Sequence, residues 1–369
     1  MSAIRLSKYE LLRIIAISMI VLHHSIVYGV MDGGQIFSLW ETGSWFNRVI
    51  ACVMDAGGEI GVGLFFMLTG FFAKKDMQPL RKILSIVVQS YYYAFLSLIF
   101  CLLVFYLGYR FDEIGFTAFL RGLVRITLIP STGGCWWFVT AYVFLVLLSP
   151  KINEIFERYR MRGKFVIVAF IWFFWYVAGS FGAPFYIFYR ALFFYLIGIC
   201  LRDYFLENKE LSNCTKMMLF LGFLTSYSAF AALDYFLCDF SLRGLGLVAQ
   251  VIEKLQTALC VPLACICFFA FVSSLKDFSN SFINRMASFS FAVYLMHDPS
   301  ILHFYIWKNA FKIPSAYNEA YFPLYAVGCL VLLFILATIL DSIRQSIQPR
   351  LLNSCLDKID KFNRNNYKV

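Results

Sequence analysis

Long apolar segments recur along the chain and constrain its fold more than any other feature of the sequence. A helix needs about 20 apolar residues to cross a bilayer, and only helices and closed barrels satisfy their backbone hydrogen bonds there. The segments are continuous rather than alternating, which favours helices. We therefore predict an all-α, polytopic integral membrane protein with about ten transmembrane helices, at residues 9–30, 52–73, 83–108, 136–150, 164–181, 184–202, 216–237, 256–275, 285–307 and 321–341.

The composition agrees with this fold class. The chain is 61% hydrophobic and 15% charged, whereas soluble domains have about 45–50% apolar and about 25% charged residues. We expect one transmembrane domain over 1–369, with its spans within 8–341 and a short basic cytoplasmic tail at 342–369. The segment 111–128 is expected to form an interfacial or re-entrant helix. The first span is expected to be retained, because Arg13 lies inside it and no small-residue cleavage site follows.

The basic residues predict the orientation. The net charge is +10, and 23 of the 32 Lys and Arg residues fall on the side of the N-terminus if ten spans are drawn. The positive-inside rule therefore predicts that both termini are cytoplasmic. No soluble basic face with interleaved aromatic residues is evident, so nucleic acid is not an expected partner.

The eleven cysteines do not indicate a metal site. Most lie inside apolar segments, and no CxxC pair with metal-binding spacing occurs. We expect them to act as small apolar residues in helix packing, and we expect no metal.

Arg13 and His24 stand out in the first span. They are eleven residues apart, which on an α-helix is three turns plus about 20°, so both side chains point the same way. Their separation along the axis is about 16 Å. Ionisable groups inside spans are costly and usually mark a pathway or a site, although Arg13 alone also fits a side chain that extends to lipid phosphate.

A long ligand with an anionic end fits these two depths. Coenzyme A carries phosphates that suit Arg and Lys at the cytoplasmic face, and its extended pantetheine arm would bring a thioester to His24. A neutral imidazole is well suited to take a proton from an alcohol near neutral pH.

Several motifs resemble the acyltransferase-3 family of membrane proteins. Arg13, ten intervening residues and His24 match its R-x10-H signature. The stretch GVGLFFMLTGFF (61–72) resembles its second helix, with Thr69 in the usual serine place. WWFVTAYVFLVLLSP (136–150) is similar to its tryptophan-rich helix, and SFSFAVYLMHDP (288–299) to its late histidine element. The resemblance extends from about Lys8 to about Leu340.

The resemblance also suggests the donor site. Lys74 and Lys75 fall where the family carries a basic cytoplasmic cluster, although that cluster is often rich in arginine. We expect Arg13, Lys74, Lys75 and either Arg81 or Lys82 to hold the phosphates of the donor.

The family implies an enzyme that transfers an acyl group, commonly acetyl, from cytoplasmic acyl-CoA to a hydroxyl. Acceptors in the family are mostly sugars of surface polysaccharides or lipid-linked glycans, so the expected partners are acyl-CoA, a glycan and the lipid bilayer. The location implied is the inner (plasma) membrane of a bacterium. His24 is the expected general base, with direct transfer and an acyl-histidine intermediate both open.

Other polar residues complete the predicted site. His297, which the resemblance favours, and Asp298 after it are expected to act in acid–base chemistry or to position the acceptor. Glu59, Asp55 or Asp298 is expected to orient His24, and the sequence does not choose among them. His23 and His303 are interpreted as structural or interfacial.

Trp137 and Arg190 are the predicted acceptor-binding residues. A flat indole suits the apolar face of a sugar, while Trp136 is interpreted as part of an interfacial aromatic belt. Arg190 should seek a carboxylate or the water of the site. Gly57, Gly58 and Gly61 suggest close helix packing or mobility near the site.

A different class of function is a secondary transporter or flippase for a glycolipid or small anionic solute. It would explain many spans with intramembrane charge, but its usual matched halves with broken helices are not evident in the sequence.

Overall fold

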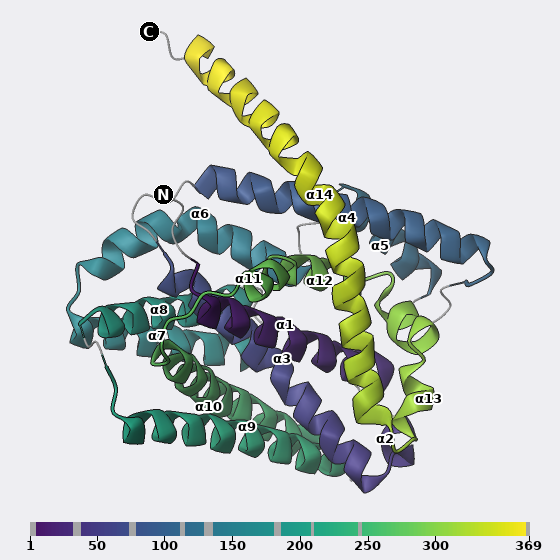
Figure 1. Ribbon diagram of the computed structural model, residues 1–369. Coiled ribbons are helices and arrows are strands. Elements are labelled where there is room, and N and C mark those ends of the chain that lie inside the picture. The colour runs from purple at the N-terminus through teal and green to yellow at the C-terminus, as the bar shows by residue number, and fades with distance from the viewer. Residues whose placement is uncertain are drawn as a thin grey trace.

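The computed structural model describes residues 5–31, 38–73, 79–110, 115–128, 136–180, 186–207, 210–242 and 246–366. These residues form helices, turns and loops, with no strand among them (Figure 1). The elements are α1 (Ser7–Gly29), α2 (Ser38–Thr42), α3 (Trp45–Phe71), α4 (Pro79–Tyr106), α5 (Phe116–Leu128), α6 (Trp137–Glu157), α7 (Met161–Ser180), α8 (Tyr186–Glu207), α9 (Asn213–Leu242), α10 (Gly246–Ser273), α11 (Ser281–Ala287), α12 (Ser290–His297), the π-helix η1 (Tyr305–Ala310), α13 (Ile313–Tyr317) and α14 (Phe322–Asn366).

The prediction of an all-α polytopic membrane protein is confirmed. Within the described ranges, seven helices are long and apolar enough to cross a membrane: α1, α3, α4, α6, α9, α10 and α14. Helices α7 and α8, of 20 and 22 residues, pack against each other beside them. The bilayer core holds no water, so each backbone N–H and C=O of a spanning segment must find its hydrogen-bond partner within the same helix. Long helices therefore dominate the fold.

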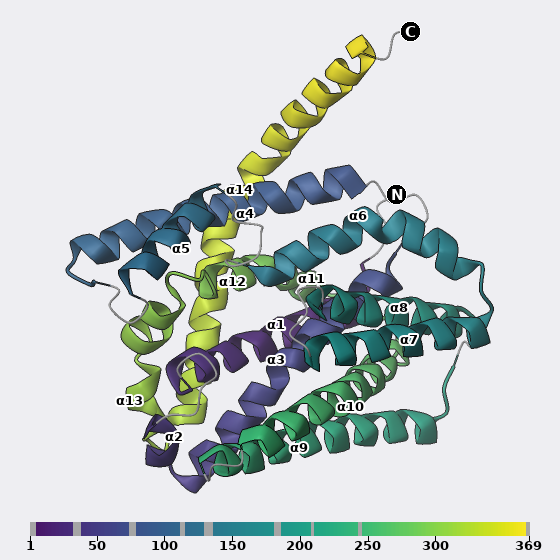
Figure 2. The ribbon, with the colours of Figure 1, turned by 180° about the vertical axis from the view of Figure 1, so that it is seen from behind.

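The start of α1 defines what we call the N-terminal end of the bundle. Ser7 donates a hydrogen bond to Asn284 Oδ1 at 2.8 Å, and Lys8 Nζ donates to the backbone oxygen of Ser273 at 2.7 Å. The ring of Tyr9 lies 5.1 Å from that of Phe71, at the end of α3. Helix α10 ends on this side, and α14, which begins near the opposite end of α1, also runs towards this side, so its far end lies here in both views (Figures 1 and 2).

The ninth predicted span, 285–307, is not a single helix. The chain forms α11, a short break, and then α12, which ends at His297. Proline lacks a backbone N–H and disfavours helical geometry in the residue before it, and Pro299 follows Asp298, whose φ and ψ of −129° and 42° lie outside the helical region. The break leaves His297 and Asp298 at a helix end inside the protein.

Two predicted peripheral segments have helical structure. Helix α5 covers part of the predicted interfacial segment and packs beside α4. The predicted tail at 342–369 continues α14 as far as Asn366, and this extension projects away from the other helices (Figures 1 and 2).

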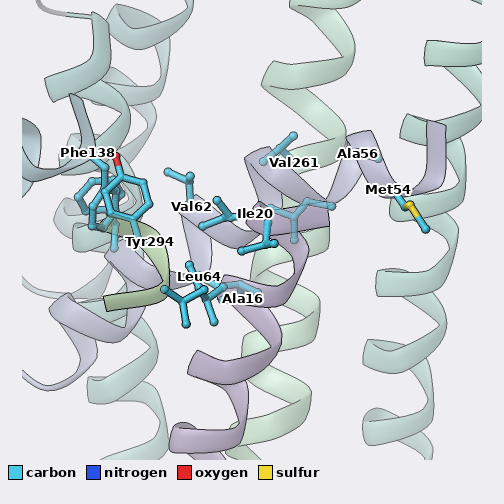
Figure 3. Packing of buried hydrophobic residues seen from close by; sticks show 14 of the residues in the cluster. Ala16, Ile20, Met54, Ala56, Val62, Leu64, Phe138, Val261 and Tyr294 are labelled. Atoms are coloured by element: carbon cyan, nitrogen blue, oxygen red, sulfur yellow. The ribbon is translucent and has the colours of Figure 1, made fainter. Parts of the chain in front are cut away.

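Helices α1 and α3 pack against each other at the centre of the fold. Figure 3 shows Ala16 and Ile20 of α1 near Val62 and Leu64 of α3. Small residues permit this approach, because a Cβ on Gly61 would lie 2.5 Å from the backbone oxygen of Ala16. The expectation of close packing at these glycines is therefore supported.

Helix α4 is fixed by a buried polar network with α14. The Asp341 side chain is fully buried. It accepts hydrogen bonds from Arg344 at 2.6 Å and from Gln89 and Tyr93 of α4, each at 3.2 Å. Gln348 also donates to the Ser85 hydroxyl at 2.8 Å. These bonds set the position of α4 opposite α1 and α3.

Candidate active site

A cavity of about 1000 Å³ lies between the α1–α3 pair and helices α4, α6, α8 and α12. It extends from the N-terminal end of the bundle to the level of His24. Both residues of the predicted pair, Arg13 and His24, line it, as their helical spacing predicted. The other polar lining residues are Arg5, Tyr9, Glu10, His23, Tyr28, Glu59, Thr69, Lys82, Ser85, Trp137, Tyr142, Tyr186, Arg190, Ser288, Ser290 and Tyr294.

The N-terminal end of the cavity is basic. Arg5, Arg13 and Lys82 line it together with one carboxylate, Glu10. Arg13 Nη1 donates to Glu10 Oε2 at 2.5 Å, and Arg13 keeps one third of its side chain exposed. Lys82 Nζ lies 5.2 Å from the centre of the Tyr142 ring. The cations exceed the carboxylate here, which favours an anionic ligand.

The predicted donor residues have different positions. Arg13 lines the cavity, whereas Arg81 is exposed and is not part of its lining. Its neighbour Lys82 is the residue of this pair that faces the cavity. Lys74 and Lys75 lie outside the described residues.

His24 and His297 form a direct hydrogen bond. His24 Nδ1 lies 2.7 Å from His297 Nε2, and His297 Nδ1 lies 2.7 Å from the backbone oxygen of Val293. A carbonyl only accepts, so Nδ1 of His297 carries a proton and, in the neutral ring, Nε2 accepts from His24. His24 Nδ1 is then the donor, and its Nε2 keeps a free lone pair. The pair can therefore present one basic nitrogen to the cavity.

The three candidate carboxylates contact different side chains. Asp298 Oδ2 lies 3.8 Å from His24 Nδ1. Glu59 forms an ion pair with Arg190 of α8. Asp55 Oδ1 lies 2.8 Å from Nδ1 of His23, the neighbour of His24. Of the three, Asp298 is thus the carboxylate near His24, while Glu59 and Asp55 hold other side chains.

Arg190 connects two of the predicted residues. It pairs with Glu59, as expected for a buried cation, and its guanidinium carbon lies 4.7 Å from the centre of the Trp137 ring. One face of this indole is therefore occupied by Arg190. Trp136 is fully buried, so the interpretation of Trp136 as part of an interfacial belt is wrong. Burial against the helices around it replaces contact with lipid.

Tyr28 is a cavity residue that was not predicted from the sequence. Its ring lies 5.4 Å from that of His24 and stacks on His303 at 4.0 Å, with the ring planes 6° apart. Tyr28 follows His24 by four residues, and this helical spacing was a signal for a shared face. The stacking also explains why His303 does not line the cavity.

Tyr294 and Phe138 were also missed as wall residues. Figure 3 shows them next to each other, with ring centres 5.5 Å apart. No group of three or more His, Cys, Asp or Glu side chains suited to a metal ion occurs in the part of the chain that the structure describes.

Comparison with known proteins gave one family match. Residues 6–341 match the family model described as "Acyltransferase domain" (Acyl_transf_3). This range contains every long helix except the last part of α14. No curated protein and no solved structure matched the chain.

Proposed function

The chain belongs to the acyltransferase-3 family, and from this premise we propose that it is a membrane O-acyltransferase that uses acyl-CoA, with acetyl as the expected acyl group. The proposed acceptor is a hydroxyl of a cell-surface or lipid-linked glycan. One observation carries the proposal: a single cavity is lined by Arg13 near the N-terminal end and by His24 deeper in the bundle.

The basic end of the cavity is the proposed donor entrance. Coenzyme A brings phosphate groups, and Arg5, Arg13 and Lys82 offer cations that would bind them. Lys74 and Lys75 belong to this proposed site through the family pattern. The pantetheine arm would extend along α1 and bring the thioester to His24.

His24 is the proposed general base. Its Nε2 takes the proton of the acceptor hydroxyl as the oxygen attacks the thioester carbonyl. The carbon–sulfur bond then breaks, and the CoA thiolate leaves and receives that proton from His24. In the alternative, Nε2 of His24 attacks the carbonyl itself and an acyl-histidine forms before the hydroxyl reacts. Both routes require the lone pair on Nε2.

His297 and Asp298 are proposed to keep the proton of His24 on Nδ1, so that its Nε2 has a free lone pair. The bond from His24 to His297 fixes which nitrogen carries the proton, and the Asp298 carboxylate favours the imidazolium that forms during transfer. Glu59, Arg190 and Trp137 form the proposed acceptor wall. The Arg190–Glu59 ion pair lies against the indole of Trp137, which lines the cavity and is the proposed platform for a sugar ring.

The proposed location is the inner (plasma) membrane, with both termini in the cytoplasm. The excess of Lys and Arg on the N-terminal side supports this orientation. It would open the basic end of the cavity to cytoplasmic acyl-CoA and leave the acceptor to approach from the other side.

The first experiment measures thiol release from acetyl-CoA by purified protein in nanodiscs. Wild type and His24→Ala are compared, with and without a crude extract of the host's surface glycan. The proposal predicts release that requires His24 and increases with the extract. Normal release by His24→Ala would exclude the mechanism. Absence of both release and acetyl-CoA binding would favour a transporter or flippase instead.

A further inference from the structure

His23 is a second imidazole in the cavity, and its surroundings parallel those of His24. Its Nδ1 lies 2.9 Å from the backbone oxygen of Asp55 and 2.8 Å from Oδ1 of the same residue. Both neighbours are acceptors, so Nδ1 carries the proton whichever of them receives it. In the neutral ring, Nε2 of His23 therefore keeps its lone pair.

The place of this imidazole is fixed by one turn of α3. Asp55 holds Nδ1, and Gly58 lies directly against the ring, where a Cβ would overlap its atoms. The side chain of His23 is 23% exposed, compared with 12% for His24. His23 is thus held rigidly and yet faces the cavity.

The two rings lie beside each other. Their centres are 5.2 Å apart with the planes at 47°, and both side chains line the same cavity. Two hydrogen-bond acceptors are therefore available to one ligand. A hydroxyl has one proton and donates one hydrogen bond, so a single hydroxyl satisfies only one of the two nitrogens.

We propose that His23 is a specificity residue that selects an acceptor with two neighbouring hydroxyls. The first hydroxyl donates to Nε2 of His24 and is acylated. The second donates to Nε2 of His23 and is not acylated. This inference rests on the proposed function and narrows its acceptor to a vicinal diol, such as two adjacent hydroxyls of a sugar ring.

An isolated hydroxyl is a poor acceptor in this arrangement. It would leave Nε2 of His23 without a donor when the ligand displaces water from the cavity. Sites that are built to bond a substrate hydroxyl discriminate strongly against analogues that lack it. The Asp55 contact matters because it holds the proton of the neutral ring on Nδ1, which leaves Nε2 of that tautomer as the acceptor.

The test combines an enzyme variant with a chemical change in the acceptor. Periodate cleaves the carbon–carbon bond of vicinal diols, so the glycan extract is used untreated and after periodate oxidation and borohydride reduction. Thiol release from acetyl-CoA is measured for wild type, His23→Phe and His23→Gln in nanodiscs. The matched control is His303→Phe, which replaces a histidine that stacks on Tyr28 and does not line the cavity.

We expect periodate treatment to lower the wild-type rate about tenfold or more. His23→Phe should lower the rate on untreated extract to a similar extent, and periodate should then lower it by less than about threefold further. His23→Gln, whose amide donates to Asp55 and offers an oxygen to the cavity, should recover part of the rate. His303→Phe should respond to periodate as the wild type does.

Two results would overturn the role of His23. One is an unchanged wild-type rate on the oxidised extract, and the other is a wild-type rate for His23→Phe on the untreated extract. Failure of the proposed function gives a different result, because wild type would then release no thiol with untreated extract, or release would persist in His24→Ala.

Discussion

Backbone carbonyls fix the position of the ring proton on two histidines: His23, which lines the cavity, and His297, which is buried behind His24. The carbonyl of Val293 receives the proton of His297, and the carbonyl of Asp55 lies 2.9 Å from Nδ1 of His23. Backbone carbonyls cannot donate, so they hold the proton of a neutral ring on Nδ1. At His23 the Asp55 side chain is a second acceptor, with Oδ1 2.8 Å from Nδ1, whereas the bond from His297 to the Val293 carbonyl is removed by a substitution of His297 itself.

His297→Phe tests the link between the two imidazoles. Without the acceptor on His297, the proton of His24 is free to move to Nε2, where it removes the basic lone pair. We expect kcat to fall by about 10²–10⁴, the usual contribution of general acid–base catalysis, while KM for acetyl-CoA changes little. His297→Gln, whose carbonyl can accept from His24, should recover part of kcat. A wild-type kcat in His297→Phe would contradict the proposed role of His297 in holding the proton on Nδ1 of His24.

Arg13→Ala tests the donor entrance. A hydrogen bond to a charged group contributes about 1.5–3 kcal/mol, so KM for acetyl-CoA should rise about tenfold or more, with kcat at saturating donor nearly unchanged. Arg81→Ala removes the same side chain from an exposed position outside the cavity lining and should leave KM close to wild type. An equal increase for both variants would assign the effect to general surface charge.

The residues of the site were predictable to different degrees. Arg13 and His24 share one helix, so their common face followed from the helical repeat. The His24–His297 bond joins distant segments, and no local pattern encodes it. The partners of Glu59 and Asp55 depend on how α1, α3 and α8 pack, so the sequence left three carboxylates open where the structure separates them.

At the scale of helices, α3 and α8 approach each other closely at two glycines. A Cβ on Gly70 would overlap the backbone oxygen of Tyr195, and a Cβ on Gly198 would overlap that of Met67. The two glycines thus face the partner backbone reciprocally. This approach brings Arg190 of α8 to Glu59 of α3, so the acceptor wall depends on it.

Gly70→Ala should therefore destabilise the protein. Overpacking usually costs about 1–3 kcal/mol, and a clash with backbone atoms leaves less room for relaxation than one with a flexible side chain. We expect a lower thermal midpoint in detergent, followed by fluorescence-detected size-exclusion chromatography. Gly328→Ala is the matched control, because no atom lies within 4 Å of a Cβ there, and it should be neutral or stabilising by up to about 1 kcal/mol. Equal midpoints for the two variants would refute the packing argument.

The end of α12 at His297 could not be predicted from hydropathy. Hydropathy describes burial, and residues 285–307 are buried enough to resemble one span. Pro299 was visible in the sequence, but a proline can either bend or end a helix. In the structure α12 ends at His297, and Asp298 before the proline is not helical.

At the scale of the whole molecule, the start of α1 and the far end of α14 lie on the same side (Figures 1 and 2). Seven of the ten predicted spans correspond to described helices that are long and apolar enough to cross a membrane, because a bilayer imposes one thickness on all of them. The cavity was not predictable in shape, since it exists only where α4 is held away from α1 and α3 by its polar network with α14.

Cys214 offers a direct test of orientation. It is exposed at the start of α9, on the side where α1 begins. A membrane-impermeant thiol reagent should modify Cys214 in inverted vesicles and not in intact cells, as read by peptide mass spectrometry. Ser315→Cys, exposed in α13 near the other end of α1, should show the opposite pattern. Modification of Cys214 in intact cells would reverse the proposed topology.

The hydrogen bond from His24 to His297 joins residues 273 positions apart in the chain. The two partners are therefore synthesised at different times. During translation, α1 leaves the ribosome among the first segments and α12 among the last. Until α12 has entered the membrane, His24 lacks the partner that holds its proton. Under the proposed function, a nascent chain therefore acquires Arg13 for the donor long before it acquires a competent base, and we expect incomplete chains to lack acyl transfer.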